Sequence, residues 1–264
     1  MSQQRGDALG HRIEVAEGGN VVRAADVSLR ILQMIAFAET PLGVTQIAQG
    51  VGIAKGAVHK HLRTLMDHGM VLQDPLTSLY HLGPKIWLMG QKAPQGQVLS
   101  EIAAPLMRSI RDELSLAVVL SVPTPKSAFV LATLPSNQPI NIGVRPGSEL
   151  LLHSSAQGKI FLAFGGPELR DSLREPLPRA TPKTQTQLPV LLAELDEIRR
   201  LGYATAPEEA MLGINALAAP ILDRHGKLVG SIGLIGSIQH LAAEPPPELL
   251  NRLFALTATI GKRL

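Results

Sequence analysis

Residues 43–72 constrain the fold most strongly, because their apolar side chains recur at helical spacing on both sides of a break that holds two glycines. The break, at residues 50–52, can adopt backbone angles that other residues avoid, so we expect a tight turn there. The sequence predicts helices over residues 44–49 and 54–68, with Gly69 ending the second. The apolar residues that would form one small shared core are Ile47, Ala48, Val51, Ile53, Val58, Leu62 and Leu65.

The second predicted helix carries cations on the face opposite its apolar residues. At about 100° per residue, Lys60 and Arg63 lie on that face, Lys55 lies at its edge, and no acid precedes Asp67. Such cations neutralise phosphates and pair with guanine edges when the second helix of a helix-turn-helix enters a DNA major groove. A solvated amphipathic helix has the same periodicity, which alone does not separate the two interpretations.

Two short apolar runs follow, at residues 70–73 and 78–82, separated by the turn-forming residues 74–77. They predict a hairpin packed on the helices, which makes the unit a winged helix. The wing is poor in cations, so we expect its DNA contacts to be polar and neutral, from Thr77 and Ser78.

Residues 26–90 resemble the DNA-binding domain of the IclR family of bacterial transcriptional regulators, through SLRILQMIA (28–36), PLGVTQIAQGVGIAKGAVHKHLRTLMDHGMV (41–71) and YHLGPKIWLMG (80–90). Where the family typically begins its recognition helix with Pro-Lys-Ser-Thr-Val-His-Arg, residues 54–60 read AKGAVHK. Two hydroxyl side chains and an arginine are thus replaced, which alters the phosphate and base contacts but not the fold. His61 stands where leucine is usual, and we expect it to be partly buried without a functional role. The expected DNA contacts are Thr45, Lys55, Gly56, Ala57, His59, Lys60, Arg63, Thr77 and Ser78.

The second half alternates predicted strands and helices, with strands joined mainly by hairpins, which indicates an α+β domain with an antiparallel sheet. Strands are expected at 116–122, 127–133, 138–144, 214–222 and 227–235, and helices from Ser100 and at 155–164, 188–201 and 248–264. This half resembles the IclR effector-binding domain in HSSAQGKIFLAF (153–164), ATPKTQTQ (180–187) and residues 194–236. The resemblance implies a GAF-like sensor fold, a small-molecule effector, and dimers or dimers of dimers on a near-palindromic operator of double-stranded DNA.

In such domains the effector lies against the sheet, under the loop that leads into the helix at Ser155. The matching positions are Ile142, Leu150, Leu152, Ala156, Gln157, Ala206, Ala216, Gly233 and Ile235, and further polar candidates are His153, Ser154, Ser155 and Asn215. An apolar pocket favours a ligand with an apolar body, and free N–H groups at a helix start can receive a carboxylate. We therefore expect an aromatic or aliphatic acid; the alternative is a cavity that side chains fill.

The length of 264 residues allows two domains. We expect a flexible tail at 1–20, a winged helix-turn-helix at 21–83 whose first helix Asp26 caps, a linker with a short helix at 84–98, and an effector-binding and oligomerisation domain at 99–264. The chain has no cysteine, and it shows neither a membrane-length apolar run nor a signal-peptide pattern, so a cytoplasmic location without membrane contact is expected.

The alternative to a ligand-responsive regulator, whether repressor or activator, is a small-molecule enzyme with an accessory DNA-binding-like domain. Lys159 follows a glycine as in half a phosphate loop, but the full spacing is missing, so a structural lysine is expected. Adjacent Glu208 and Glu209 are expected to be solvated, and no nucleophile elbow accompanies His153. We expect no catalytic residue, no cofactor and no metal site.

Overall fold

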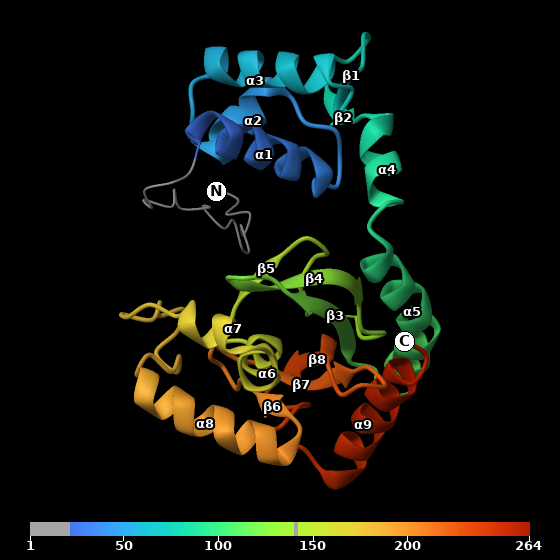
Figure 1. Ribbon diagram of the computed structural model, residues 1–264, viewed down its shortest axis with the longest axis vertical. Coiled ribbons are helices and arrows are strands. Elements are labelled where there is room, and N and C mark those ends of the chain that lie inside the picture. Colours follow the sequence, from blue (N-terminus) through green and yellow to red (C-terminus); the bar gives the residue numbers. More distant parts are fainter. Residues whose placement is uncertain (1–21, 140–141) are drawn as a thin grey trace, which may run out of the picture. The chain divides into compact units, whose positions relative to one another are not determined.

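The computed structural model describes residues 22–139 and 142–264, and the chain divides into two compact units between Ala93 and Pro94. Figure 1 colours the elements in chain order. The predicted tail at 1–20 lies outside the described residues. Among the helices in the described ranges, none is both long enough and apolar enough to cross a bilayer.

The first unit is a three-helix core with a small hairpin and one further helix. Gly52 and Gly69 adopt left-handed backbone angles, with φ of 76° and 70°, just beyond the second and third helices, as the turn residues predicted. Strands β1 and β2 pair antiparallel, so the predicted wing is present. The elements are α1 (Arg23–Ala36), α2 (Val44–Val51), α3 (Lys55–Asp67), β1 (Val71–Gln73), β2 (Tyr80–Leu82) and α4 (Pro84–Gly90).

The core of the first unit joins all three helices to the hairpin. Its fully buried side chains include Ile31 of α1, Ile47 of α2, Val58 of α3 and Val71 of β1. The prediction that Asp26 caps α1 is wrong. The helix begins three residues earlier, and Asp26 lies in its first turn, where a carboxylate also complements the helix dipole.

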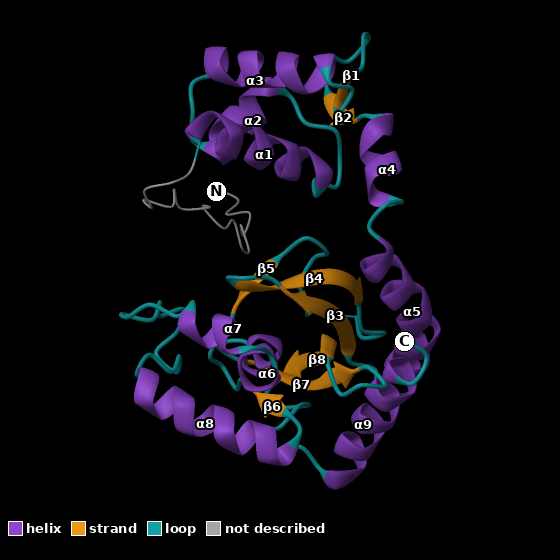
Figure 2. Cartoon of the chain, in the orientation of Figure 1, coloured by secondary structure: helices purple, strands orange, loops and turns teal. Residues whose placement is uncertain are grey.

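The second unit is a six-stranded antiparallel sheet with helices on both faces (Figure 2). The strand order β5-β4-β3-β8-β7-β6 places the two halves of the domain side by side at the centre, where β3 pairs with β8. The elements are α5 (Pro94–Leu114), β3 (Ala117–Pro123), β4 (Ser127–Leu134), β5 (Glu149–Leu151), α6 (Ala156–Phe164), α7 (Pro167–Asp171), α8 (Leu188–Leu201), β6 (Ala204–Thr205), β7 (Ile214–Leu222), β8 (Leu228–Ser237) and α9 (Pro247–Gly261).

Alternate residues of the central strands enter different cores. Leu120 and Leu217 pack with side chains of α5 and α9 on one face. Ala218, one residue further along β7, packs with α6 and α8 on the other face. This alternation, with a period of two residues, decides which side chains of the sheet face α6.

Two predicted elements differ from the structure. Residues 142–144 are not a strand, although one was expected at 138–144; the edge strand is β5, which pairs with the start of β4. Helix α5 begins at Pro94 rather than at Ser100, so most of the glycine- and proline-bearing segment expected to be a hinge is helical. Proline is compatible with the first turn of a helix, where its missing N–H has no intrahelical partner.

Candidate functional sites

Helix α3 presents the predicted cationic face to solvent. Lys55, His59, Lys60 and Arg63 are exposed, while the opposite face of the helix is buried in the core of the first unit. Within the described part of the chain, none of these side chains forms an ion pair. A Cβ placed on Gly56 would meet no heavy atom within 4 Å, so no other side chain covers the backbone of α3 at this position. The face is therefore free to contact a large polyanion.

The start of α3 leaves backbone donors available. Ala54 is the N-cap residue, and its side chain has no oxygen with which to accept a hydrogen bond. The first N–H groups with intrahelical acceptors are those of Ala57 and Val58, which both donate to the Ala54 carbonyl. The N–H groups that precede them point out of the helix at the end where the dipole favours an anion.

The wing ends in a turn built around Asp74. Its carboxylate accepts hydrogen bonds from the N–H groups of Thr77 and Leu76, both at 2.8 Å, and these bonds lower the pKa of Asp74. Thr77 and Ser78 are exposed, as the predicted wing contacts require. Ser78 has a φ of 59°, a left-handed conformation.

In the second unit, the sheet face towards α6 carries a small apolar cluster. Four of the predicted effector positions, Ile142, Leu150, Ala216 and Ile235, meet here with Val119 and other residues of the central strands. Ile142, Leu150 and Ala216 are only partly buried, so the cluster keeps exposed apolar surface. Gly233 lies beneath Gln157, since a Cβ at that glycine would approach the glutamine Cδ to 2.9 Å.

The predicted polar candidates on α6 and before it have partners within the chain. Ser155 caps α6: its Oγ accepts from the Gly158 N–H at 3.1 Å and donates to the Leu151 carbonyl at 2.7 Å. Gln157 Nε2 donates to the carbonyls of Val119 and Ser231, at 3.2 and 3.4 Å. These groups hold α6 against the sheet.

His153 and Ser154 are buried just before α6. The imidazole Nε2 of His153 lies 2.8 Å from the Pro178 carbonyl oxygen. Burial lowers the pKa of His153, against the effect of this hydrogen bond. A neutral imidazole tied to the backbone fits a structural histidine.

Asn215 does not belong to this face, which corrects the prediction. Its amide donates to the carbonyls of Leu241 and Ala242, at 3.1 and 2.8 Å, on the side of the sheet opposite its neighbour Ala216. Leu152, Ala156 and Ala206 also differ from expectation, since they are packed into the core between the sheet, α6 and α8. Of the matched positions, those in the apolar cluster and Gly233 with Gln157 remain as ligand-facing candidates.

Thr133 is a residue that sequence reasoning missed. It pairs with Val119 across β4 and β3, so its side chain lies on the face of the apolar cluster. Its Oγ1 is buried and has no hydrogen-bond partner among the described residues. A buried hydroxyl without a partner is uncommon and calls for an explanation. The strand pattern could have nominated it only if the β3–β4 register had been known.

Lys159 and Glu209 form a buried ion pair. The ammonium group also lies 2.6 Å from Glu194 Oε1 and 3.4 Å from the Thr205 carbonyl. Lys159 is structural, as predicted, but Glu209 is buried rather than solvated, which corrects the expectation for the Glu208–Glu209 pair. Burial raises the pKa of Glu209, and the charge and hydrogen bond of Lys159 oppose that shift.

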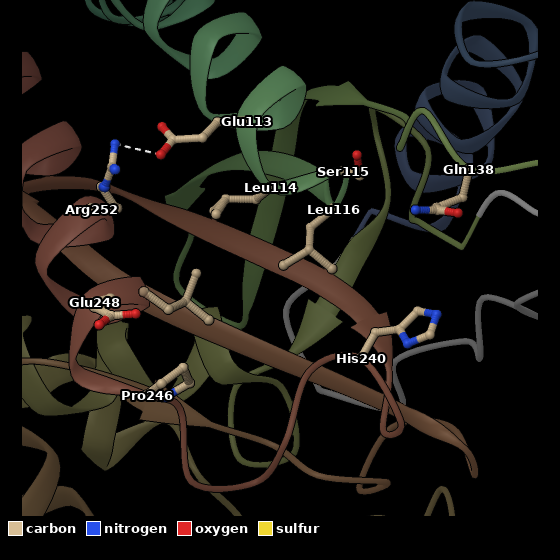
Figure 3. A pocket seen from close by; sticks show the side chains of 10 residues that line it. Glu113, Leu114, Ser115, Leu116, Gln138, His240, Pro246, Glu248 and Arg252 are labelled. Carbon is tan, nitrogen blue, oxygen red and sulfur yellow. Dashed lines mark ion pairs between the residues drawn. The ribbon is translucent and has the colours of Figure 1, made fainter.

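A surface hollow of about 430 Å³ lies on the other side of the second unit (Figure 3). Leu114 and Leu116 form part of its lining, Glu113 pairs with Arg252 at its edge, and His240 projects from the connection before α9. Charges of both signs surround it, and Arg252 already has its carboxylate partner. A second hollow of about 530 Å³ lies among the C-terminal ends of α6, α8 and α9. Neither is lined by a predicted effector residue.

A winged helix-turn-helix with an exposed cationic face, followed by a separate sheet domain with an apolar face, defines a DNA-binding regulator with a sensor domain. Family models named "IclR helix-turn-helix domain" and "Bacterial transcriptional regulator IclR C-terminal" match residues 24–75 and 91–261. The chain belongs to the IclR family of bacterial transcriptional regulators and is not an enzyme.

Curated relatives cover most of the chain. The HTH-type transcriptional regulator BhcR of Paracoccus denitrificans is 33% identical over 84% of this chain and 80% of its own. A glycerol operon regulatory protein of Streptomyces coelicolor is 30% identical over 87% and 91%. An IclR homolog from Microbacterium hydrocarbonoxydans, solved in complex with 4-hydroxybenzoate, has the same fold, with a TM-score of 0.77 at 21% identity over 91% and 98%.

Proposed function

We propose that α3 enters the major groove of an operator and that Lys60 and Arg63 neutralise phosphates or pair with guanine. The observation that carries this proposal is the exposed, unpaired cationic face of α3 among the described residues. The remaining proposed contacts are Thr45, Lys55, Gly56, Ala57, His59, Thr77 and Ser78. Acting on chromosomal DNA would place the protein in the bacterial cytoplasm.

The start of α3 supplies a phosphate contact in place of the two absent hydroxyls. Ala54 leaves the first N–H groups of the helix without a side-chain cap, and Gly56 offers no side chain that would hold the backbone away from the duplex. Helix N-termini bind phosphate through such donors together with the dipole. Lys55 adds a full positive charge at the same end.

Affinity measured against salt concentration tests this docking. Duplexes that bind the full chain are first selected from a random pool. The slope of log K against log salt is negative. Lys60→Ala and Arg63→Ala are each expected to make it less steep by about 0.9 for every phosphate that the variant no longer neutralises. Lys126→Ala, an exposed lysine on the β3–β4 hairpin of the other unit, is the matched control and should leave the slope unchanged. Unchanged slopes in both α3 variants contradict the docking.

Self-association would place two α3 helices on a near-palindromic operator, about 34 Å apart for half-sites one turn apart. Helix α4 supports it, because none of its residues is buried and Trp87, Leu88 and Met89 are all more than half exposed. An apolar helix face of this kind is stabilised when a second copy covers it. Light scattering tests this: Leu88→Glu should shift the protein to a smaller species, and an unchanged mass contradicts the role of α4.

The effector site lies on the apolar face between the sheet and the start of α6. Ile142, Leu150, Ala216, Gly233 and Ile235 would surround an apolar body, with Gln157 above it. The Ser155 cap takes the Gly158 N–H, so a carboxylate would use the N–H groups of α6 that precede Gly158. The 4-hydroxybenzoate bound to the solved relative combines an apolar ring with a carboxylate. We therefore favour an aromatic or aliphatic acid.

Calorimetry with a panel of aromatic acids, aliphatic acids and sugars tests the ligand class. Ala216→Asp places a carboxylate on the apolar face, and it should abolish acid binding while leaving unliganded DNA affinity intact. Leu192→Asp, at an exposed leucine on α8, serves as a control for the added charge. A clean preference for sugars, or binding that Ala216→Asp leaves unchanged, contradicts the assignment.

A further inference from the structure

The tip of the wing displays a leucine almost wholly to solvent. Leu76 is 94% exposed, more than any other large apolar side chain that the structure describes. Single apolar residues on a protein surface are common and need no explanation by themselves. Leu76 differs because the backbone around it is held in one conformation.

Four hydrogen bonds of Asp74 define that conformation. Its carboxylate accepts from the N–H groups of Leu76 and Thr77, its carbonyl accepts from the Ser78 N–H at 2.9 Å, and its own N–H donates to the Leu79 carbonyl at 2.9 Å. Pro75 restricts its own φ as well. The turn therefore keeps the Leu76 side chain directed away from the core of the first unit.

The chemistry of the tip suits bases better than phosphates. Residues 71–82 contain no lysine or arginine, and their one histidine, His81, lies on β2. The tip at residues 75–78 therefore has no cation with which to neutralise a phosphate. At the tip, residues 75–78, the exposed side chains are Pro75, Leu76 and the hydroxyls of Thr77 and Ser78. Proteins that enter the minor groove often insert leucine or proline between base pairs, which partly unstacks the step and kinks the duplex.

We propose that Leu76 is a minor-groove wedge that inserts at a base step beside the site read by α3 and bends the operator. This inference rests on the proposed DNA-binding role of α3. It adds a source of specificity that needs no hydrogen bond to a base, because pyrimidine–purine steps such as TA and CA kink more easily than others. Operators should therefore carry such a step at a constant distance from the centre of each half-site.

Selection from a random duplex pool, followed by fluorescence measurement of the bend, tests the wedge with the full chain. Leu76→Ala should weaken binding by about 10- to 100-fold, as expected when one leucine is no longer buried, and should reduce the bend. Its salt slope should stay at the wild-type value, because the variant neutralises the same phosphates. The TA or CA preference should disappear from duplexes selected with this variant.

Two further variants distinguish the loss of the Leu76 side chain from a general disturbance of the wing. Leu72→Ala removes another exposed leucine, 42% exposed on β1 of the same hairpin, and should leave the bend unchanged. Asp74→Ala keeps the leucine but removes two of the bonds that hold the turn, so it should reduce the bend.

The outcomes also separate the two proposals. If the wild-type chain retains no duplex from the pool, the DNA-binding role itself fails. If it binds, and Lys60→Ala makes the salt slope less steep while Leu76→Ala keeps wild-type affinity, bend and step preference, only the wedge is overturned. Leu76→Met, which preserves an apolar side chain of similar length, should retain most of the bend.

Discussion

Replacing Lys159 with methionine is expected to destabilise the second unit strongly. The lysine side chain is 1% exposed and bridges Glu209 and Glu194. Methionine keeps most of the apolar stem but removes the charge. The carboxylate of Glu209, a residue that is 7% exposed, would then keep the Gln185 N–H, at 3.3 Å, as its donor among the described residues.

The size of this destabilisation follows from the burial of the Glu209 carboxylate. Removing one partner of a buried ion pair costs about 3–5 kcal/mol, because the other charge stays buried without compensation. Glu194, whose side chain is 35% exposed, can turn towards water and adds little to this figure. A destabilisation of that size lowers the melting temperature of a unit of this length by about 6–20 °C.

Acid should reduce this destabilisation. Burial already raises the pKa of Glu209 from its ordinary value of 4.5, and removing Lys159 raises it further. A carboxyl group whose folded-state pKa is raised stabilises the fold below its unfolded pKa, and this contribution is lost as pH rises through the folded pKa. The difference in free energy of unfolding between Lys159→Met and the wild type should therefore become smaller as pH falls towards 4.5.

Scanning calorimetry of the full chain measures the effect, and fluorescence locates it. The chain has one tryptophan, Trp87, which lies in the first unit and so reports a unit that does not contain Lys159. Adding Glu209→Gln to Lys159→Met should recover part of the stability, because the unpaired charge is removed. A destabilisation below about 1 kcal/mol, or a double variant less stable than Lys159→Met, would refute the reasoning.

Three further predictions concern the face of the sheet towards α6. Gly158→Ala should cost several kcal/mol in chemical denaturation, because its Cβ would lie 2.5 Å from both Cα and O of Leu152; wild-type stability would contradict this close approach. Thr133→Val should raise the free energy of unfolding by about 1 kcal/mol, since an unpartnered hydroxyl is removed. It should also weaken the binding of a hydroxylated ligand relative to the binding of its deoxy analogue. A lower free energy of unfolding would mean that the hydroxyl has a partner. Burial lowers the pKa of His153 from 6.5, so stability should be complete above that pH and decline as pH falls below it, and His153→Gln should flatten this decline in denaturation measured across pH 5–7.

Local interactions explain what sequence alone predicted well. Helix boundaries in the first unit depend on apolar periodicity and on glycines at 52 and 69, and these act within a few residues along the chain. The Ser155 cap and the turns between paired strands are equally local. The cationic face of α3 follows from the helix period once the buried side is known. Family resemblance extended these predictions to both units.

Long-range packing explains the errors in the sheet, whereas the starts of α1 and α5 were misplaced by a few residues along the chain. The edge strand was expected at 138–144 and lies at Glu149–Leu151, because only pairing with β4 distinguishes the two segments. Asn215 was assigned to the ligand face together with its neighbour Ala216, although successive residues of a strand point to opposite sides, so only one of the two can lie there. Packing decides which, since Ala216 joins the apolar cluster and Asn215 bonds to Leu241 and Ala242.

The sequence by itself determined where most of the helices lie, which helix carries cations, and the family to which the chain is related, because these depend on residues near one another in the chain. Tertiary structure alone decided the partners. Lys159 meets Glu209 fifty residues later, Thr133 lies beside Val119 with no acceptor among the described residues, and Leu76 remains uncovered at the wing tip. Each of these depends on which distant segments fold against one another, and side-chain spacing does not contain that information.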